Sequence, residues 1–231
     1  IEKVKSMELI DLTGLHAHIG SQIFETKPFA AEAELLLDLV TKYGLQEINI
    51  GGGLGIPYLA QHQPPAIDHL AREIAAVLKG KTVAKLLVEP GRSIVGSAGV
   101  TLYTVGGTKE IPGIRKYVFV DGGMSDNPRP ILYDARYEAV IADKPEAAGT
   151  EEVRVAGRFC ESGDILINEV KLPPVKIGDI FTVAATGAYN YSMASNYNRV
   201  TRPAMVLVNE SDAALIVKRE SYEDLVANDA A

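Results

Sequence analysis

The chain has 231 residues, and its 30 Asp plus Glu outnumber 23 Lys plus Arg to give a net charge of −7. This balance excludes the broad basic surface on which nucleic-acid binding depends. The single cysteine cannot form an internal disulfide, so nothing indicates an oxidising compartment. The chain starts without the apolar core of a signal peptide, and no apolar run approaches the roughly 20 residues that span a bilayer. We therefore expect a cytoplasmic protein that binds neither nucleic acid nor membrane.

The first hundred residues alternate strand-like and helix-like patterns. We expect strands at residues 9–20, 46–50 and 84–89 and helices at residues 28–43 and 66–79. Apolar side chains recur on one face of the first helix at Phe29, Ala33, Leu36 and Val40. Strands separated by helices run parallel, but three such strands cannot close a barrel, which needs about eight.

The pattern changes near residue 99 to short strands separated by turn residues. We expect these strands at residues 100–105, 116–121, 152–157, 164–170, 179–185, 204–209 and 214–219. The sequence therefore predicts two domains without a flexible linker. Residues 1–98 form an α/β domain, and residues 99–231 form an antiparallel β domain.

Each predicted strand of the first domain ends in polar or glycine-rich residues. These endings are HAHIGS at residues 16–21, IGGGLG at 50–55 and EPGR at 89–92. Ligands of parallel α/β proteins gather where the carboxyl ends of the strands meet. We therefore treat the three endings as one candidate site.

Several interpretations of these residues stay open when each is taken alone. His16 and His18 face the same way on a strand, so they suit a zinc site, a buried core position or a platform under a planar ligand. Three consecutive glycines expose N–H groups that bind anions, but they also suit a tight turn with positive φ. Glu89 and Arg92 form either a local ion pair or a pair of sites for a cationic ring nitrogen and an anion.

The β domain offers a second group of candidates. Arg129 and Tyr133 lie four residues apart, which suits either surface packing or ligand binding. Cys160, the only cysteine, precedes Glu161 in the glycine-bracketed loop GRFCESGD. A lone cysteine is usually inert and buried, but a neighbouring carboxylate favours the protonated thiol, which suits a proton donor.

Six motifs taken together resemble the fold type III pyridoxal-phosphate-dependent decarboxylases. They are GLHAHIGSQ, NIGGGLGIPY, EPGRSIV, RPILYDA, CESGD and GAYNYSMASNYN. The last three favour the branch that acts on diaminopimelate. The resemblance implies the C-terminal part of a (β/α)8 barrel followed by an antiparallel β domain, as in alanine racemase. It also implies a head-to-tail homodimer with shared active sites and no metal.

The resemblance also assigns roles to individual residues. It implies that His18 stacks on the ring of pyridoxal 5′-phosphate and that Glu89 pairs with the ring nitrogen. Cys160 matches the proton donor, and Cys160 with Glu161 reaches into the active site of the partner subunit. The other cofactor positions are Ser21, Gly52, Gly53, Gly91, Arg92 and Tyr189. The substrate positions are Arg92, Arg129, Tyr133, Glu161 and Tyr189.

The implied reaction is the decarboxylation of meso-2,6-diaminopimelate to L-lysine, the last step of lysine biosynthesis. The alternatives are a related ornithine or arginine decarboxylase and a non-catalytic homologue that acts as a binding protein. Glu161 after Cys160 argues against an ornithine enzyme, which usually has aspartate there. The Schiff-base lysine of the family lies upstream of anything in this chain. We therefore expect a truncated or cleaved part of a decarboxylase, inactive on its own.

Overall fold

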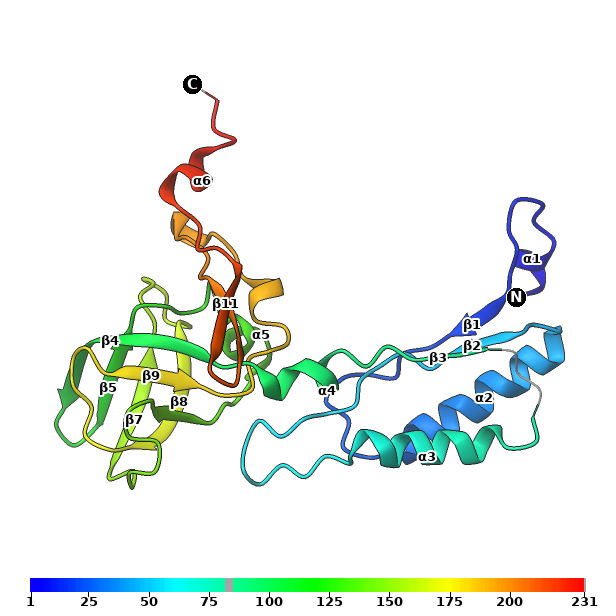
Figure 1. Ribbon diagram of the computed structural model, residues 1–231, viewed down its shortest axis with the longest axis horizontal. Helices are drawn as coiled ribbons and strands as arrows, with labels where there is room; N and C mark the ends of the chain where they lie inside the picture. Colours follow the sequence, from blue (N-terminus) through cyan, green and yellow to red (C-terminus); the bar gives the residue numbers. More distant parts are fainter. Residues whose placement is uncertain (82–84, 231) are drawn as a thin grey trace. The chain divides into compact units, whose positions relative to one another are not determined.

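The computed structural model describes residues 1–81 and 85–230, and it divides into two compact units, Ile1–Ser97 and Ala98–Ala231. The first unit contains α1 (Glu2–Lys5), β1 (Gly14–His16), α2 (Lys27–Tyr43), β2 (Glu47–Asn49), α3 (Ile67–Leu78), β3 (Lys85–Leu87) and α4 (Arg92–Val95), followed by the short 3-10 helix η1 (Gly96–Ala98). Its three strands form one parallel sheet in the order β1-β2-β3 (Figure 1).

The predicted strands and helices of the first unit are confirmed, but the strands are shorter than expected. The predicted strand at residues 9–20 is reduced to β1 because strand pairing reaches only as far as the neighbouring strand offers partners. That neighbour, β2, is only three residues long, and the glycines begin two residues after its end, at Gly51. Of the third predicted strand, Ala84 lies outside the described residues.

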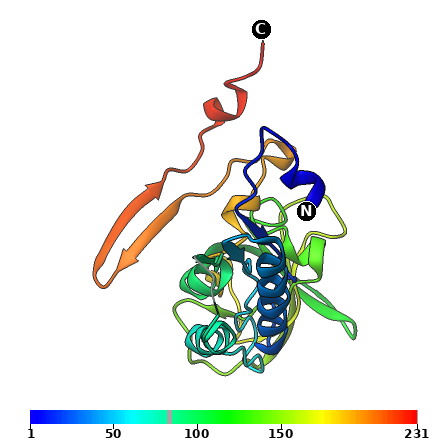
Figure 2. The same cartoon turned by 90° about the vertical axis from the view of Figure 1, so that its right-hand side faces the viewer.

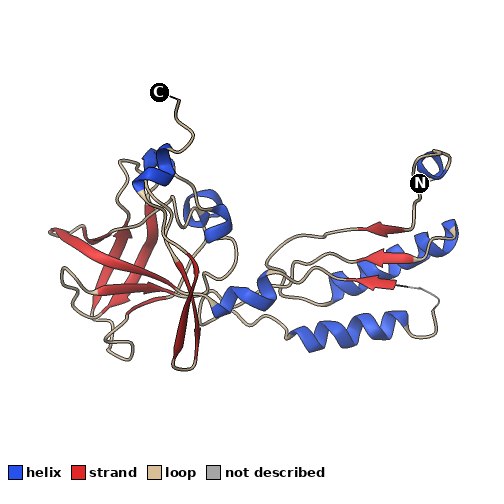
Figure 3. Ribbon diagram, turned by 45° about the horizontal axis from the view of Figure 1, so that its top comes forward, coloured by secondary structure: helices blue, strands red, loops and turns tan. Residues whose placement is uncertain are grey.

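Helices α2 and α3 lie on the same side of this sheet (Figure 3). The α2 helix begins with Pro28 in its first turn and ends at Gly44, which adopts a left-handed conformation with φ 66°. The predicted apolar face is confirmed, since Phe29, Ala33, Leu36 and Val40 are all buried. They pack with Ile48 and Ile50 from β2 in one hydrophobic core.

The opposite face of the sheet is polar. Successive side chains of a strand point to opposite faces, so the residues that alternate with the buried Ile48 share this second face. Register places Gly14, Glu47 and Lys85 in one row and His16, Asn49 and Leu87 in the next. Glu47 and Lys85 form an ion pair at 3.3 Å. The polar face therefore presents two rows of side chains that lead to the carboxyl ends of the strands.

The helix-covered side of the first unit also has a hollow of about 570 Å³. Apolar residues of α3, including Ile67, Leu70 and Leu78, line it together with Leu86 and Val88. It offers few polar groups, so the polar face of the sheet is better suited to chemistry.

The second unit contains a six-stranded sheet in the order β6-β9-β4-β5-β7-β8. Its elements are β4 (Thr101–Ile111), β5 (Arg115–Val120), α5 (Arg129–Tyr133), β6 (Ala139–Ile141), β7 (Glu151–Ala156), β8 (Ile165–Leu172) and β9 (Ile180–Val183). After the short 3-10 helices η2 (Tyr191–Met193) and η3 (Tyr197–Arg199) come β10 (Met205–Asn209), β11 (Asp212–Val217) and α6 (Tyr222–Val226).

All seven strands predicted for this unit are present. The unit differs from the prediction in one pairing, because β5 and β7 run parallel while the other pairs are antiparallel. The sheet is therefore mixed. Strand β6 was not predicted, since its three residues are too few for an alternating pattern.

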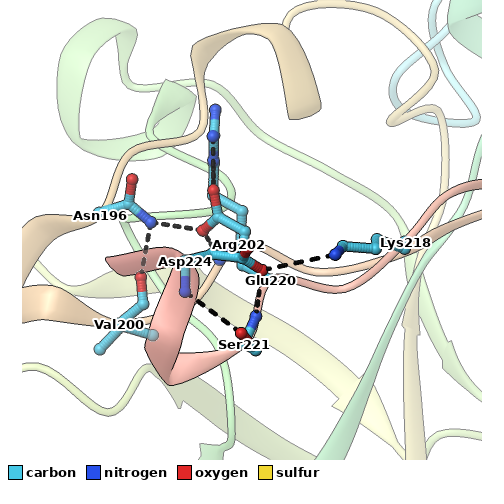
Figure 4. Close-up of polar contacts among 7 residues, drawn as sticks. All are labelled: Asn196, Val200, Arg202, Lys218, Glu220, Ser221 and Asp224. Carbon is cyan, nitrogen blue, oxygen red and sulfur yellow. Dashed lines mark hydrogen bonds and ion pairs between the residues drawn. The ribbon is translucent and has the colours of Figure 1, made fainter. Parts of the chain in front are cut away.

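Strands β10 and β11 form a hairpin of their own, which Figure 2 shows as a separate two-stranded ribbon. Glu220 closes the root of this hairpin (Figure 4). Its carboxylate accepts hydrogen bonds from the backbone N–H and the Nε–H of Arg202, both at 2.7 Å, and from Asn196 Nδ2 at 2.5 Å. The Arg202 side chain and backbone N–H lower the pKa of Glu220 to about 2. The hairpin root thus depends on an ionised Glu220.

Glu220→Gln should loosen the hairpin at neutral pH. Because the folded-state pKa is depressed, the stabilising effect of Glu220 is present above pH 4.5 and is lost as the pH falls toward 2. We expect amides of residues 205–217 in the variant to exchange with solvent about tenfold faster at pH 7, with the difference vanishing near pH 2. Hydrogen exchange measures this, with Glu210→Gln in the hairpin turn as the control. Equal exchange in wild type and Glu220→Gln at pH 7 would contradict the assignment.

Candidate active site

The glycine loop, residues 51–53, lies against the segments that follow β1 and β3. A Cβ atom on Gly52 would lie 2.2 Å from the carbonyl oxygen of Glu89, and one on Gly53 would lie 2.2 Å from that of Gly20. Gly53 also has φ +110°, which side chains disfavour. Hydrogen bonds from Glu89 N to Gly51 O at 2.7 Å and from Ile23 N to Gly53 O at 3.0 Å hold these segments together. The three strand endings therefore meet, as expected from their parallel order.

His18 is held by this loop. Its Nδ1 accepts a hydrogen bond from the N–H of Gly52 at 3.2 Å, which in a neutral imidazole leaves the proton on Nε2. The N–H of Gly52 therefore contacts His18, whereas the resemblance assigned Gly52 to the cofactor. His16 Nε2 lies 3.7 Å from Glu89 Oε2. Within residues 1–81 and 85–230, no three His, Cys, Asp or Glu side chains gather in an arrangement that could hold a metal ion.

Glu89 has a partner that the sequence did not predict. Asn49 Nδ2 donates to Glu89 Oε1 at 2.8 Å, and Asn49 Oδ1 accepts the N–H of Gly51 at 2.9 Å. Asn49 ends β2 and shares its strand face with Gly51, so its position just before the glycines was a usable signal.

Arg92, the first residue of α4, joins a second polar group at the strand ends. Its guanidinium donates to Ser21 Oγ at 3.1 Å and to the hydroxyl of Tyr58, and it lies over the Tyr58 ring at 5.6 Å. Gly91 precedes this helix, and its carbonyl oxygen accepts the N–H groups of Ile94 and Val95. The structure therefore brings Ser21 and Arg92 together, with the buried Tyr58 as a further residue that the sequence did not predict.

A buried carboxylate lies close enough to interact with the two histidines. Glu32 of α2 is 6% exposed, and neither carboxylate oxygen has a hydrogen-bond partner in the part of the chain that the structure describes. Burial raises the pKa of Glu32, and its electrostatic interaction with His18 and His16 partly offsets this. Its position on the apolar face of the predicted helix, three residues after Phe29, is a pattern that indicates a buried carboxylate, although Glu32 was not predicted as a site residue.

In the second unit, Asp164 holds the loop that carries Cys160. Its carboxylate is 3% exposed and accepts the N–H groups of Met124 at 2.7 Å and Phe159 at 2.8 Å. A Cβ atom on Gly157 would lie 2.3 Å from this carboxylate, so only glycine fits there. Burial raises the pKa of Asp164, and the two N–H groups partly offset this. Cys160 and Glu161 are both exposed. The buried Asp164 therefore fixes a loop whose two reactive side chains are accessible.

Glu161 contacts Tyr197, a residue that was not among the predicted site residues, which included Tyr189 instead. The hydroxyl of Tyr197 donates to Glu161 Oε1, and this hydrogen bond raises the pKa of Tyr197. The rings of Phe159 and Tyr197 also meet edge to face at 5.5 Å. Tyr189 is 46% exposed and has φ +60°. Tyr197 therefore joins the Cys160 loop directly.

Arg129 and Tyr133, paired by their spacing, differ in environment. Arg129 is 7% exposed, and its guanidinium donates to the Tyr137 hydroxyl at 2.7 Å and lies over that ring at 5.6 Å. Tyr133 is 63% exposed. Ile131, between them on α5, lies where a Cβ on Gly163 would contact it at 2.5 Å. The α5 helix therefore packs against the loop of Cys160.

Asp164→Asn should free part of this loop. An amide offers one oxygen, so at least one of the N–H groups of Met124 and Phe159 loses its acceptor and should exchange with solvent about tenfold faster or more. Asp126→Asn is the matched control, because Asp126 accepts the N–H of Gly123 at 3.0 Å and the Tyr103 hydroxyl at 2.7 Å. It should leave exchange at Gly123, Met124 and Phe159 nearly unchanged, because Oδ1 of the introduced asparagine can still accept the Gly123 N–H while its Nδ2 donates to the Tyr103 hydroxyl. Hydrogen exchange measured by NMR resolves these amides. Equal exchange rates of the Met124 and Phe159 amides in the two variants would contradict the role of Asp164 in holding this loop.

Comparison with known proteins places these observations in a family. A family model described as "Pyridoxal-dependent decarboxylase, C-terminal sheet domain" matches residues 11–187. The diaminopimelate decarboxylase of Synechocystis sp. is 55% identical over 228 residues, covering 94% of this chain and 48% of that protein. The Bacillus subtilis diaminopimelate decarboxylase is 48% identical over 241 residues, covering 99% of this chain and 55% of that protein.

Solved structures of similar proteins agree with this family match. Diaminopimelate decarboxylase from M. jannaschii in complex with L-lysine matches with a TM-score of 0.89 and 37% identity, covering 100% of this chain and 54% of that one. The lysine/ornithine decarboxylase of Vibrio vulnificus with putrescine matches with a TM-score of 0.74 and 26% identity, covering 87% of this chain and 56% of that one. The expected fold class, part of a barrel joined to a β domain, is confirmed. The chain spans about half the length of the relatives it matches, and it belongs to the pyridoxal-dependent decarboxylase family.

Proposed function

We propose that this chain is part of an enzyme that decarboxylates meso-2,6-diaminopimelate to L-lysine with pyridoxal 5′-phosphate, as a cytoplasmic homodimer. The observation that carries the proposal is the meeting of His18, the glycine loop, Glu89 and Arg92 at one edge of the parallel sheet. Support comes from relatives named diaminopimelate decarboxylase at 40–55% identity. No helix in the described part of the chain has the length and apolar content to cross a membrane.

The strand-end residues fit this cofactor. The glycine loop packs its backbone closely against the neighbouring strand endings, and Ser21 Oγ, Arg92 and the N–H of Gly53 supply donors and charge for a phosphate. His18, fixed through Gly52, offers a flat face for the ring. Glu89 offers a carboxylate for the ring nitrogen. When bound, the cofactor supplies an electron sink for the bond that breaks at the substrate Cα.

The proposed substrate carries an amino acid group at each end. Arginine holds a carboxylate through two parallel hydrogen bonds, which suits Arg92 and Arg129. Arg129 is already oriented by Tyr137, so its guanidinium does not need to be ordered when substrate binds. The Glu161 carboxylate suits a substrate ammonium group, with Tyr133 and Tyr189 as further contacts.

Cys160 completes the reaction in this proposal. When the bond from Cα to the carboxylate breaks, CO2 leaves and the electron pair stays with the substrate. The Cys160 S–H then gives its proton to Cα, and the thiolate regains a proton from solvent. Its exposed position beside Glu161 suits delivery to a neighbouring site. In the homodimer, Cys160 and Glu161 serve the active site of the partner subunit.

The proposed substrate is tested by a competition assay on the full-length enzyme. With cofactor present, CO2 release from diaminopimelate, ornithine, arginine and lysine is measured at equal concentrations. We expect kcat/KM to be highest for diaminopimelate. Preference for another substrate would favour the related decarboxylases, and no turnover of any of them would favour a binding-only homologue.

Cys160→Ala should slow turnover by roughly 10²-fold or more, the usual scale for loss of a positioned acid. Cofactor absorbance should stay nearly unchanged, because the thiol does not hold the ring. Ser162→Ala, two residues further along the same loop, is the matched control and should retain activity. Normal turnover by Cys160→Ala would remove Cys160 from the mechanism.

A further inference from the structure

Asn49 lies on the polar face of the first sheet, at the last position of β2. Register places it between His16 of β1 and Leu87 of β3. The residue that follows β3 in the same alternation is Glu89. Asn49 is therefore the last side chain on this face before the glycine loop, and it faces the neighbouring strand ending.

The orientation of the Asn49 amide is determined by the backbone. The N–H of Gly51 can only donate, and it points to Asn49 Oδ1 at 2.9 Å. The amide nitrogen must then point away from Gly51, and it donates to Glu89 Oε1 at 2.8 Å. An isosteric aspartate would keep the Gly51 contact but would place an oxygen against the carboxylate of Glu89.

Glu89 needs such a partner to keep one orientation. Its side chain is 54% exposed, so rotamer freedom would otherwise spread the carboxylate over several positions. The backbone of Glu89 is fixed by the hydrogen bond that its N–H donates to the carbonyl oxygen of Gly51 at 2.7 Å. With Oε1 held by Asn49, Oε2 is left facing His16 Nε2 at 3.7 Å.

We propose that Asn49 is a positioning residue: it ties the Glu89 carboxylate to the glycine loop and so sets the direction in which Glu89 meets the cofactor ring. The role rests on the proposed function, because it assumes that Glu89 contacts the cofactor. It makes the glycine loop and Glu89 one unit, joined through a single amide.

The experiment is a double-mutant cycle on the intact protein with Asn49→Asp and Glu89→Gln. Absorbance titration with pyridoxal 5′-phosphate gives the Kd of each variant. Asn49→Asp alone should raise Kd about tenfold or more, because two carboxylates then repel at the site. In the Glu89→Gln background the same change should raise Kd less than about twofold, because Asn49 acts through Glu89.

Thermal unfolding without cofactor gives an independent readout. Asn49→Asp should lower Tm by about 2–4 °C. The double variant should recover most of this loss, because the introduced glutamine amide can donate to the introduced aspartate and re-form the hydrogen bond in the reverse direction. If Asn49→Asp alone does not fold, a double variant that does fold would equally show that Asn49 acts through its hydrogen bond with Glu89. Failure of the proposed function would appear as wild type that does not bind the cofactor, while this stability pattern persists.

Glu47→Gln is the matched control. It removes the charge of the ion pair with Lys85 between the same two strands, one row further from the strand ends. It should leave the Kd unchanged. The proposal is overturned if Asn49→Asp weakens cofactor binding equally in both backgrounds, if it has no effect, or if the double variant is no more stable than the single one.

Discussion

The first unit depends on the close approach of backbone to backbone at the glycine loop. Gly52 and Gly53 stand where any side chain would collide with the carbonyl oxygens of Glu89 and Gly20. A collision there would push the endings of β1 and β3 away from β2. The same contact lets the N–H of Gly52 hold His18 and the N–H of Gly51 orient Asn49. The close backbone contact therefore explains both why glycine is required at these positions and how His18 and Asn49 are oriented.

The second unit fixes its reactive loop by burial of a charge. Asp164 is removed from water, and two backbone N–H groups and the space beside Gly157 compensate for this. Cys160 and Glu161 stay exposed at the far end of the same loop. Both units thus share one feature: a rigid, buried contact holds in place side chains that remain accessible. Such support is what a positioned acid or a cofactor contact requires.

The sequence predicted what local patterns encode. The periodicity of residues 28–43 and 66–79 determined α2 and α3, and the glycine motifs marked the strand ends. Contacts that depend on pairing across 34 to 40 residues were missed, including Asn49 with Glu89 and Arg92 with Tyr58. The parallel pairing of β5 with β7 is of the same kind, since register between distant segments is set by the whole fold. Tyr197 was not predicted because its contact with Glu161 spans 36 residues, whereas Tyr189 and Tyr197 share one motif that does not distinguish them.

The proposed function requires that the strand endings of the first unit form one cofactor site. The most direct measurement is a titration of the intact protein, labelled with 15N-glycine, with pyridoxal 5′-phosphate, followed by NMR. We predict saturable shifts of the Gly20, Gly52 and Gly53 amides at the concentrations where absorbance reports binding. The turn glycines Gly113 and Gly178 of the second unit should not shift. Binding detected by absorbance without any shift at Gly52 and Gly53 would contradict the account.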